Sequence, residues 1–109
     1  MLRRKKDKLA VEEFCSRVRE GLDNDILAIK LFGSKLTDTD TPESDIDLFI
    51  VVREKTAEVE NRILDIAFEL DLKHDVYLSP RIVAESVLKH PVWRNTPFIR
   101  HVEHGGASL

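Results

Sequence analysis

Hydrophobic residues recur along the chain with two different periods, and each period predicts a different kind of element. Residues 7–21 carry apolar side chains at helical spacing, which predicts a helix that ends near Gly21. Residues 26–32, ILAIKLF, are aliphatic and stop at a glycine, which predicts a strand. The first third of the chain is therefore expected to be a helix followed by a strand.

The remaining pattern predicts two further strands and three helices. Residues 45–52 are almost continuously apolar after two aspartates, which is typical of a strand covered on both faces. Apolar positions at helical spacing predict an amphipathic helix over residues 56–70. The rest of the chain predicts a third strand at 75–79 closed by Pro80, a short helix at 82–89, and a last helix at 93–103 that stops at Gly105 and Gly106.

This order of elements predicts an α+β (α/β) fold, in which helices pack on a small mixed β-sheet. A length of 109 residues suits one domain, residues 1–109. The first two predicted strands are joined by residues 33–44. A connection of that length is long for a tight hairpin, so we expect the loop to have a role of its own.

Composition and charge narrow the function classes. The formal charge of -3 argues against a general nucleic-acid-binding protein, and the basic run of residues 3–6 reads as a solvated tail. The single cysteine, Cys15, excludes an internal disulfide and fits a reducing compartment. No apolar run approaches the ~20 residues of a membrane span. We therefore expect a soluble, cytoplasmic protein.

The candidate chemistry begins with two carboxylates at the start of a strand. Asp45 and Asp47 are one residue apart, so both project from the same face, with Cα atoms roughly 6.5–7 Å apart. Two like charges at that spacing raise each other's pKa unless a cation lies between them. Oxygen ligands suit Mg²⁺, so the pair is a candidate metal-binding site. Aspartate is, however, also common at strand starts as a turn residue.

A glycine-serine pair precedes these aspartates. Gly33 allows positive φ and a close backbone approach to a phosphate. Ser34 offers a hydroxyl and an amide, and Lys35 adds positive charge, so the three residues could cradle a triphosphate. The Walker spacing is absent, and a glycine-serine pair after a strand is by itself most often a simple turn.

The combination is more specific than either part. Gly33-Ser34, ten intervening residues and Asp45-Ile46-Asp47, each bounded by an apolar strand, resemble the signature of the DNA polymerase beta-like nucleotidyltransferase superfamily. The sequence LFGS…SDIDLFIVV is similar to the corresponding segment of the minimal nucleotidyltransferases of prokaryotes. The resemblance implies that the glycine-serine turn holds a nucleoside triphosphate, such as ATP, and that the aspartates hold divalent metal.

The resemblance also implies a third carboxylate on the next core strand. Asp75 is the matching candidate, with Asp71 at the end of the preceding helix as the runner-up. The implied site consists of Asp45, Asp47 and Asp75 as catalytic and metal-binding residues, with Gly33, Ser34 and Lys35 as nucleotide-binding residues. Two Mg²⁺ ions held there would stabilise the attacking and leaving oxygens while a nucleoside monophosphate, AMP from ATP, moves to an acceptor hydroxyl.

The acceptor and the partners stay open at the level of the sequence. The resemblance implies a HEPN-type partner protein, whose tyrosine can receive AMP in pairs that resemble a toxin and its antitoxin. The alternative is a nucleotide-binding or partner-binding subunit that does not turn over by itself. A homodimer is plausible because a small sheet has an edge to cover. The base preference and the role of the basic N-terminal run cannot be assigned.

Three side chains outside the motif have structural interpretations. Asp38 and Asp40 lie in the polar loop and are interpreted as solvated turn residues. Phe98 is expected to pack internally. Trp93 is left undecided between internal packing and an interface with another chain.

Overall fold

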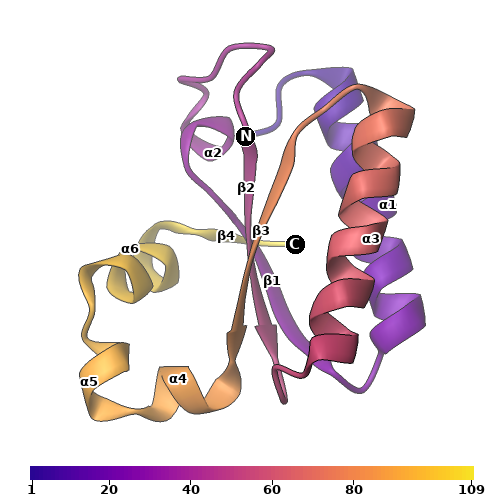
Figure 1. Cartoon of the computed structure of the whole chain (residues 1–109). Helices are drawn as coiled ribbons and strands as arrows, with labels where there is room; N and C mark the ends of the chain where they lie inside the picture. The colour runs from indigo at the N-terminus through magenta and orange to yellow at the C-terminus, as the bar shows by residue number, and fades with distance from the viewer.

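The computed structural model describes all 109 residues as a four-stranded sheet with helices on both faces (Figure 1). The elements, in chain order, are α1 (Lys5–Leu22), β1 (Ile26–Phe32), α2 (Ser34–Thr37), β2 (Ile46–Val52), α3 (Ala57–His74), β3 (Leu78–Ala84), α4 (Glu85–Lys89), α5 (Pro91–Arg94), α6 (Pro97–Gly105) and β4 (Ala107–Ser108).

The sheet is mixed, with strand order β3-β2-β1-β4. β1 and β2 pair antiparallel, so Phe32 at the end of β1 lies opposite Asp47 near the start of β2. β2 and β3 pair in parallel through the α3 crossover, with Ile46 opposite Leu78. β4 pairs antiparallel with β1 through two residues. The predicted α+β (α/β) fold with a small mixed sheet and packed helices is confirmed.

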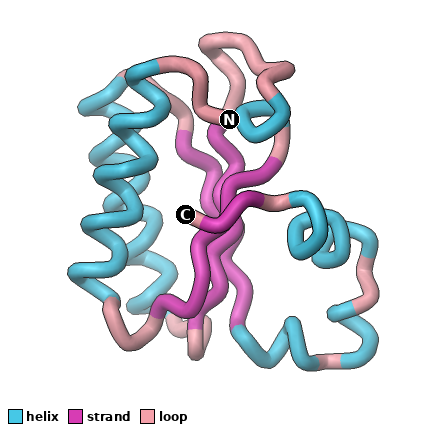
Figure 2. The backbone as a smooth tube through the Cα atoms, turned by 180° about the vertical axis from the view of Figure 1, so that it is seen from behind, coloured by secondary structure: helices cyan, strands magenta, loops and turns pink.

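The main hydrophobic core lies between one face of the sheet and the helices α1 and α3, which run side by side (Figures 1 and 2). Alternate strand residues such as Leu31, Leu48 and Ile50 are fully buried against this helical layer. Phe14 of α1 and Ile63 and Leu70 of α3 are fully buried from the helix side. Eighteen buried residues belong to this cluster, so most of the apolar burial lies on one face.

The opposite face of the sheet carries a much smaller cluster under α6. Phe49 and Val51 of β2 are buried there against Ile99 and Val102. Phe98 makes edge-to-face contacts with Phe32 and Phe49, at ring-centroid distances of 5.7 and 6.0 Å. The expected internal packing of Phe98 holds in this form, although 40% of the residue stays exposed.

The long helix α3 has clear start and stop signals. The Thr56 hydroxyl accepts a hydrogen bond from the amide of Val59 at 3.2 Å, and acidic residues occupy the first turn. The helix ends where Asp75 adopts a left-handed conformation, with φ 54° and ψ 54°. α3 therefore extends four residues beyond the predicted end at residue 70.

The third strand differs most from its prediction. β3 covers Leu78–Ala84, not residues 75–79, and Pro80 lies inside it opposite Leu48. Proline is tolerated there because β3 is an edge strand, where one side of the backbone needs no hydrogen-bonded neighbour. The helix predicted at 82–89 is consequently shortened to α4, and the helix predicted at 93–103 is divided into α5 and α6. No helix is long and apolar enough to cross a membrane.

Candidate nucleotide and metal site

One end of the sheet gathers most of the residues singled out in the sequence. β1 runs toward this end and stops at Phe32, immediately before Gly33 and Ser34. β2 and β3 both start here, so Asp45 and Asp47 lie at the same end. The α2 turn and the loop that follows it stand above this end of the sheet (Figure 1).

Gly33 and Asp47 are in direct contact. Gly33 has φ +77°, a region that L side chains rarely adopt, and a Cβ built on it would lie 2.3 Å from Asp47 Oδ2. Only glycine therefore fits beside the carboxylate in this arrangement. The contact brings the glycine-serine turn and the second aspartate together, although they are fourteen residues apart (33 and 47).

Ser34 begins the short helix α2. Its carbonyl oxygen accepts a hydrogen bond from the amide of Thr39 at 3.2 Å, which closes the turn. Its hydroxyl makes no hydrogen bond within the chain and remains available to a ligand.

The two aspartates of the β2 start share an unfavourable electrostatic environment. Burial raises the pKa of Asp47, the nearby charge of Asp45 raises it further, and the positive charge of Arg81 partly offsets both effects. Asp45 itself is exposed. A cation bound between these carboxylates would relieve their repulsion, so this donor pair suits a hard divalent ion.

Asp71, the runner-up for the third carboxylate, lies close to this pair. Its Oδ1 accepts a hydrogen bond from the amide of Leu78 at 2.7 Å, and Leu78 lies opposite Ile46 in the sheet. Burial raises the pKa of Asp71, the hydrogen bond from Leu78 opposes this, and the charge of Asp45 raises the pKa further. Asp71 therefore belongs to the electrostatic neighbourhood of Asp45.

Asp75 does not lie in a strand. It is the exposed residue that ends α3, three positions before β3 begins, and its backbone carbonyl accepts a hydrogen bond from Lys6 Nζ at 3.0 Å. Nowhere in the chain do three carboxylate, histidine or cysteine side chains gather closely enough to hold a metal ion. The structure thus unites Gly33 and Ser34 with Asp47, adds Asp71 to the Asp45 neighbourhood, and leaves Asp75 as a prediction.

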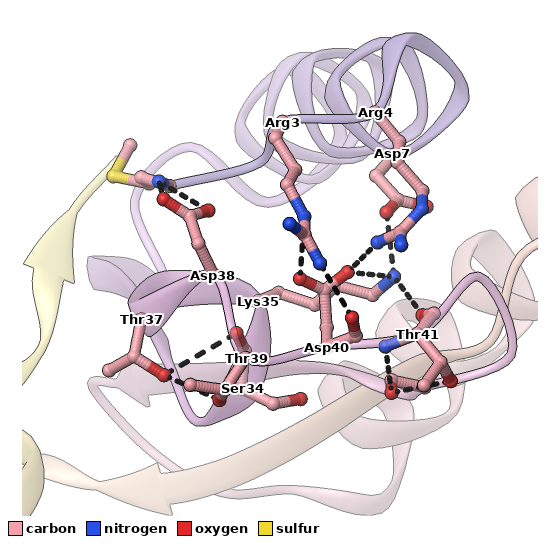
Figure 3. A network of polar contacts seen from close by, with 12 residues as sticks. Arg3, Arg4, Asp7, Ser34, Lys35, Thr37, Asp38, Thr39, Asp40 and Thr41 are labelled. Carbon is pink, nitrogen blue, oxygen red and sulfur yellow. Dashed lines mark hydrogen bonds and ion pairs between the residues drawn. The ribbon is translucent and has the colours of Figure 1, made fainter.

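Lys35 points into a buried ion cluster beside the start of α1 (Figure 3). Its Nζ lies 2.7 Å from Asp7 Oδ2, 2.8 Å from Asp40 Oδ2 and 3.0 Å from the carbonyl oxygen of Thr41. All three ammonium hydrogens are thereby used. Lys35 as a nucleotide-binding residue stays a prediction that this geometry disfavours.

Asp40 was expected to be solvated, and that expectation is wrong. Its side chain is 1% exposed because it is surrounded by Lys35, Arg3 and Arg4. The hydrogen bond from Lys35 lowers the pKa of Asp40 against the opposing effect of burial. The basic run at residues 3–6 is likewise no free tail, because Arg3, Arg4 and Lys6 all bind the folded chain. Asp38 is exposed and pairs with the N-terminal amine.

Sequence reasoning missed Arg81. In the observed register it lies two residues after Ser79, which is opposite Asp47, so the same sheet face carries Asp47 and Arg81. The guanidinium lies 5.8 Å from the ring centroid of Phe98 and acts electrostatically on Asp47. The sequence would have indicated that Arg81 shares a sheet face with Asp47 only if the third strand had been predicted at residues 78–84.

Comparisons with known proteins relate most of the chain to one family. The family model described as "Polymerase beta, Nucleotidyltransferase" matches residues 17–97, which include every residue of the site from Gly33 to Arg81. A protein of Methanocaldococcus jannaschii named as a "putative protein adenylyltransferase" is 30% identical over 100 residues, covering 91% of this chain and 94% of the relative. No solved structure matches the chain.

Proposed function

Because the chain belongs to the polymerase beta-like nucleotidyltransferase family, we propose that it transfers AMP from ATP to a hydroxyl group on another protein. Family membership supports nucleotide transfer, and the relative's name supports AMP as the group and a protein as the acceptor. The observation that carries the proposal is the contact between Gly33 and Asp47, because it places a phosphate-accommodating turn against a candidate metal-binding carboxylate.

The donor set fits a divalent ion. Asp45 and Asp47 supply two carboxylates, and Mg²⁺ is commonly held by one or two carboxylates together with substrate phosphates. Asp71 and Asp75 are the candidates for a third ligand. Bound there, Mg²⁺ would neutralise phosphate charge and favour departure of pyrophosphate.

The residues of this chain would bind and orient the reactants. The Gly33–Ser34 backbone and the free Ser34 hydroxyl would hold the β- and γ-phosphates beside Asp47. The acceptor oxygen would form a bond to the α-phosphorus as the bond to the bridging oxygen breaks, which releases pyrophosphate. The hydroxyl proton would pass to a carboxylate, and the raised pKa of Asp71 suits it to that task.

The acceptor would be a separate protein. The helices and strands of these 109 residues all belong to the sheet and its covering helices, so none forms a separate acceptor-binding unit. We propose a HEPN-type partner, encoded by a neighbouring gene, with a tyrosine hydroxyl as the acceptor. Incubating the chain and that partner with α-labelled ATP and Mg²⁺ should move label onto the partner.

Two pairs of variants make the test specific. Asp47→Asn and Gly33→Ala should each lower transfer at least about a hundredfold, because they disturb charge and geometry at the phosphate turn. Glu54→Gln is the control for Asp47, because this exposed carboxylate lies just after β2, at the opposite end of the strand. Gly105→Ala is the control for Gly33, because a Cβ there meets nothing within 4 Å. Transfer that survives Asp47→Asn would refute the assignment.

The second candidate is a nucleotide-binding subunit without turnover of its own. The absence of a close group of three metal-binding side chains favours it. Under this function, Mg²⁺ and ATP together should raise the Tm of the wild-type chain, while no label reaches any partner. The Tm rise should again be lost in Asp47→Asn and kept in Glu54→Gln.

A further inference from the structure

A cluster of buried charged residues lies beside the phosphate turn, although Lys and Asp are rarely fully buried unless they are paired. Asp7, Lys35 and Asp40 are each 6% exposed or less, and Lys35 Nζ lies 2.7 Å from Asp7 Oδ2 and 2.8 Å from Asp40 Oδ2. Apolar residues of similar volume commonly stabilise a fold as well as a buried ion cluster does. Hydrogen-bonded charges do, however, favour one arrangement of the chain, because any other arrangement would leave a buried charge without an opposite charge beside it.

This cluster ties together two segments that are far apart in the sequence. Asp7 lies in the first turn of α1, Lys35 directly follows Ser34, and Asp40 lies in the loop that leads to Asp45. Arg4 pairs with Asp40 Oδ2, and Arg3 donates to the carbonyl oxygen of Asp40 at 2.7 Å. These contacts hold the loop between the glycine-serine turn and the aspartate pair against the start of α1 (Figure 3).

Residues 2–7 also contact the C-terminal end of α3, on the other side of the site. The amide of Leu2 donates to the carbonyl oxygen of Lys35 at 3.1 Å. Lys6 Nζ donates to the carbonyl oxygen of Asp75 at 3.0 Å, at the C-terminal end of α3. Residues 2–7 therefore contact both the phosphate turn and the α3 end that carries Asp71 and Asp75.

We propose that residues 2–7 are a positioning element for the nucleotide site, and that the Asp7–Lys35–Asp40 cluster holds the Gly33–Ser34 turn ready for a triphosphate. Lys35 is then a positioning residue, because its ammonium acts on the loop and not on the phosphates. The inference rests on the proposed nucleotide binding, and it gives the basic run at residues 3–6 a role in that site.

The test uses Asp7→Asn in the full chain, because it removes one charge of the cluster and keeps the size of the side chain. Amide hydrogen exchange of residues 33–41 should become at least about tenfold faster, and the affinity for ATP with Mg²⁺ should fall about tenfold. Lys35→Arg, which keeps the charge, should lose less affinity than Lys35→Met, which removes it.

Val18→Ala is the control, because it removes fully buried volume from the same helix without touching the loop. It should lower the Tm while affinity for ATP and exchange of residues 33–41 stay within about twofold of the wild type. Unchanged exchange of residues 33–41 in Asp7→Asn would overturn the inference even if no nucleotide binds. Wild-type ATP binding that Asp7→Asn leaves intact would also overturn it, whereas a wild type that binds no ATP refutes the proposed function.

Discussion

At the scale of single residues, the site depends on groups that are unfavourable for the empty protein. The raised pKa of Asp47 means that its ionised form costs folding free energy. Unfavourable electrostatics of this kind are characteristic of binding sites, because a ligand that relieves the repulsion gains affinity. Substitution of Asp47 should therefore improve stability, whereas Gly33 tolerates no side chain.

Asp47→Asn should therefore stabilise the chain when neither nucleotide nor metal is present. The folded protein holds the Asp47 carboxyl with a pKa above its ordinary value of 3.8, so the folded state binds more protons than the unfolded state as pH rises from that value. The contribution of Asp47 to stability consequently falls as pH rises through its folded-state pKa, and Asp47→Asn removes this unfavourable contribution. We expect the Tm of Asp47→Asn to exceed that of the wild type by about 2 °C or more at pH 7.

The pH dependence provides the check. Thermal unfolding followed from pH 3 to pH 7 should show the two Tm values converging at low pH, where the carboxyl is protonated in both states. Glu54→Gln should follow the wild type throughout. An Asp47→Asn chain less stable than the wild type at pH 7 would contradict the electrostatic interpretation.

Local spacing in the sequence selected Gly33, Ser34, Asp45 and Asp47, and the structure places them at one end of the sheet, while their roles in binding stay predictions. The sequence did not reveal the surroundings of Lys35 and Asp40, because these are set by Asp7 and the basic run, which approach only in the folded chain. From the sequence alone, a charged residue next to a motif is expected to be exposed to solvent. No pattern in the sequence marks it as buried.

At the scale of elements, strand β1 matches its prediction at both ends, and β2 and α3 match in type and position. The assignment of residues 75–79 as a strand was wrong for two local reasons. Asp75 closes α3 in a left-handed turn, and Pro80, interpreted as a stop, is accepted at the sheet edge. The misplaced strand also means that Asp75 lies in the turn that ends α3 and not in β3, so its role as the third carboxylate stays a prediction.

The helices α5 and α6 allow a direct comparison of two aromatic residues. Phe98 contacts Phe32 and Phe49, so Phe98→Ala should lower the free energy of unfolding by about 2 kcal/mol, less than for a fully buried ring. Trp93 is 55% exposed and belongs to no aromatic pair, so Trp93→Ala should change it by about 0.5 kcal/mol or less. Urea unfolding measures both, and equal losses would contradict the packing described for α6.

At the scale of the whole molecule, the two faces of the sheet differ in how much they bury. The face under α1 and α3 holds eighteen clustered buried residues, and the face under α6 holds four. Local opening requires less free energy where fewer apolar contacts are broken. The segment from α4 to α6 should therefore open without unfolding the rest of the chain.

Native-state hydrogen exchange can detect this difference. Amides of α5 and α6 should exchange through openings of lower free energy than amides of α1, β2 and α3, which should exchange only on global unfolding. Adding low concentrations of urea should leave the α6 opening nearly unchanged while it accelerates the exchange of α1. Equal protection of α6 and α1 would show that the chain unfolds as one cooperative unit.

The outer side of β3 has a consequence for assembly. Backbone groups alternate sides along a strand, and because Tyr77 accepts a hydrogen bond from Ile46, the amides of Leu78, Pro80 and Ile82 face outward. The amide of Leu78 already donates a hydrogen bond to Asp71, and Pro80 has no amide hydrogen to donate. A neighbouring copy of the chain would find almost no free backbone hydrogen-bond donors along this edge of the sheet. At high protein concentration, molecules should therefore resist joining their sheets edge to edge.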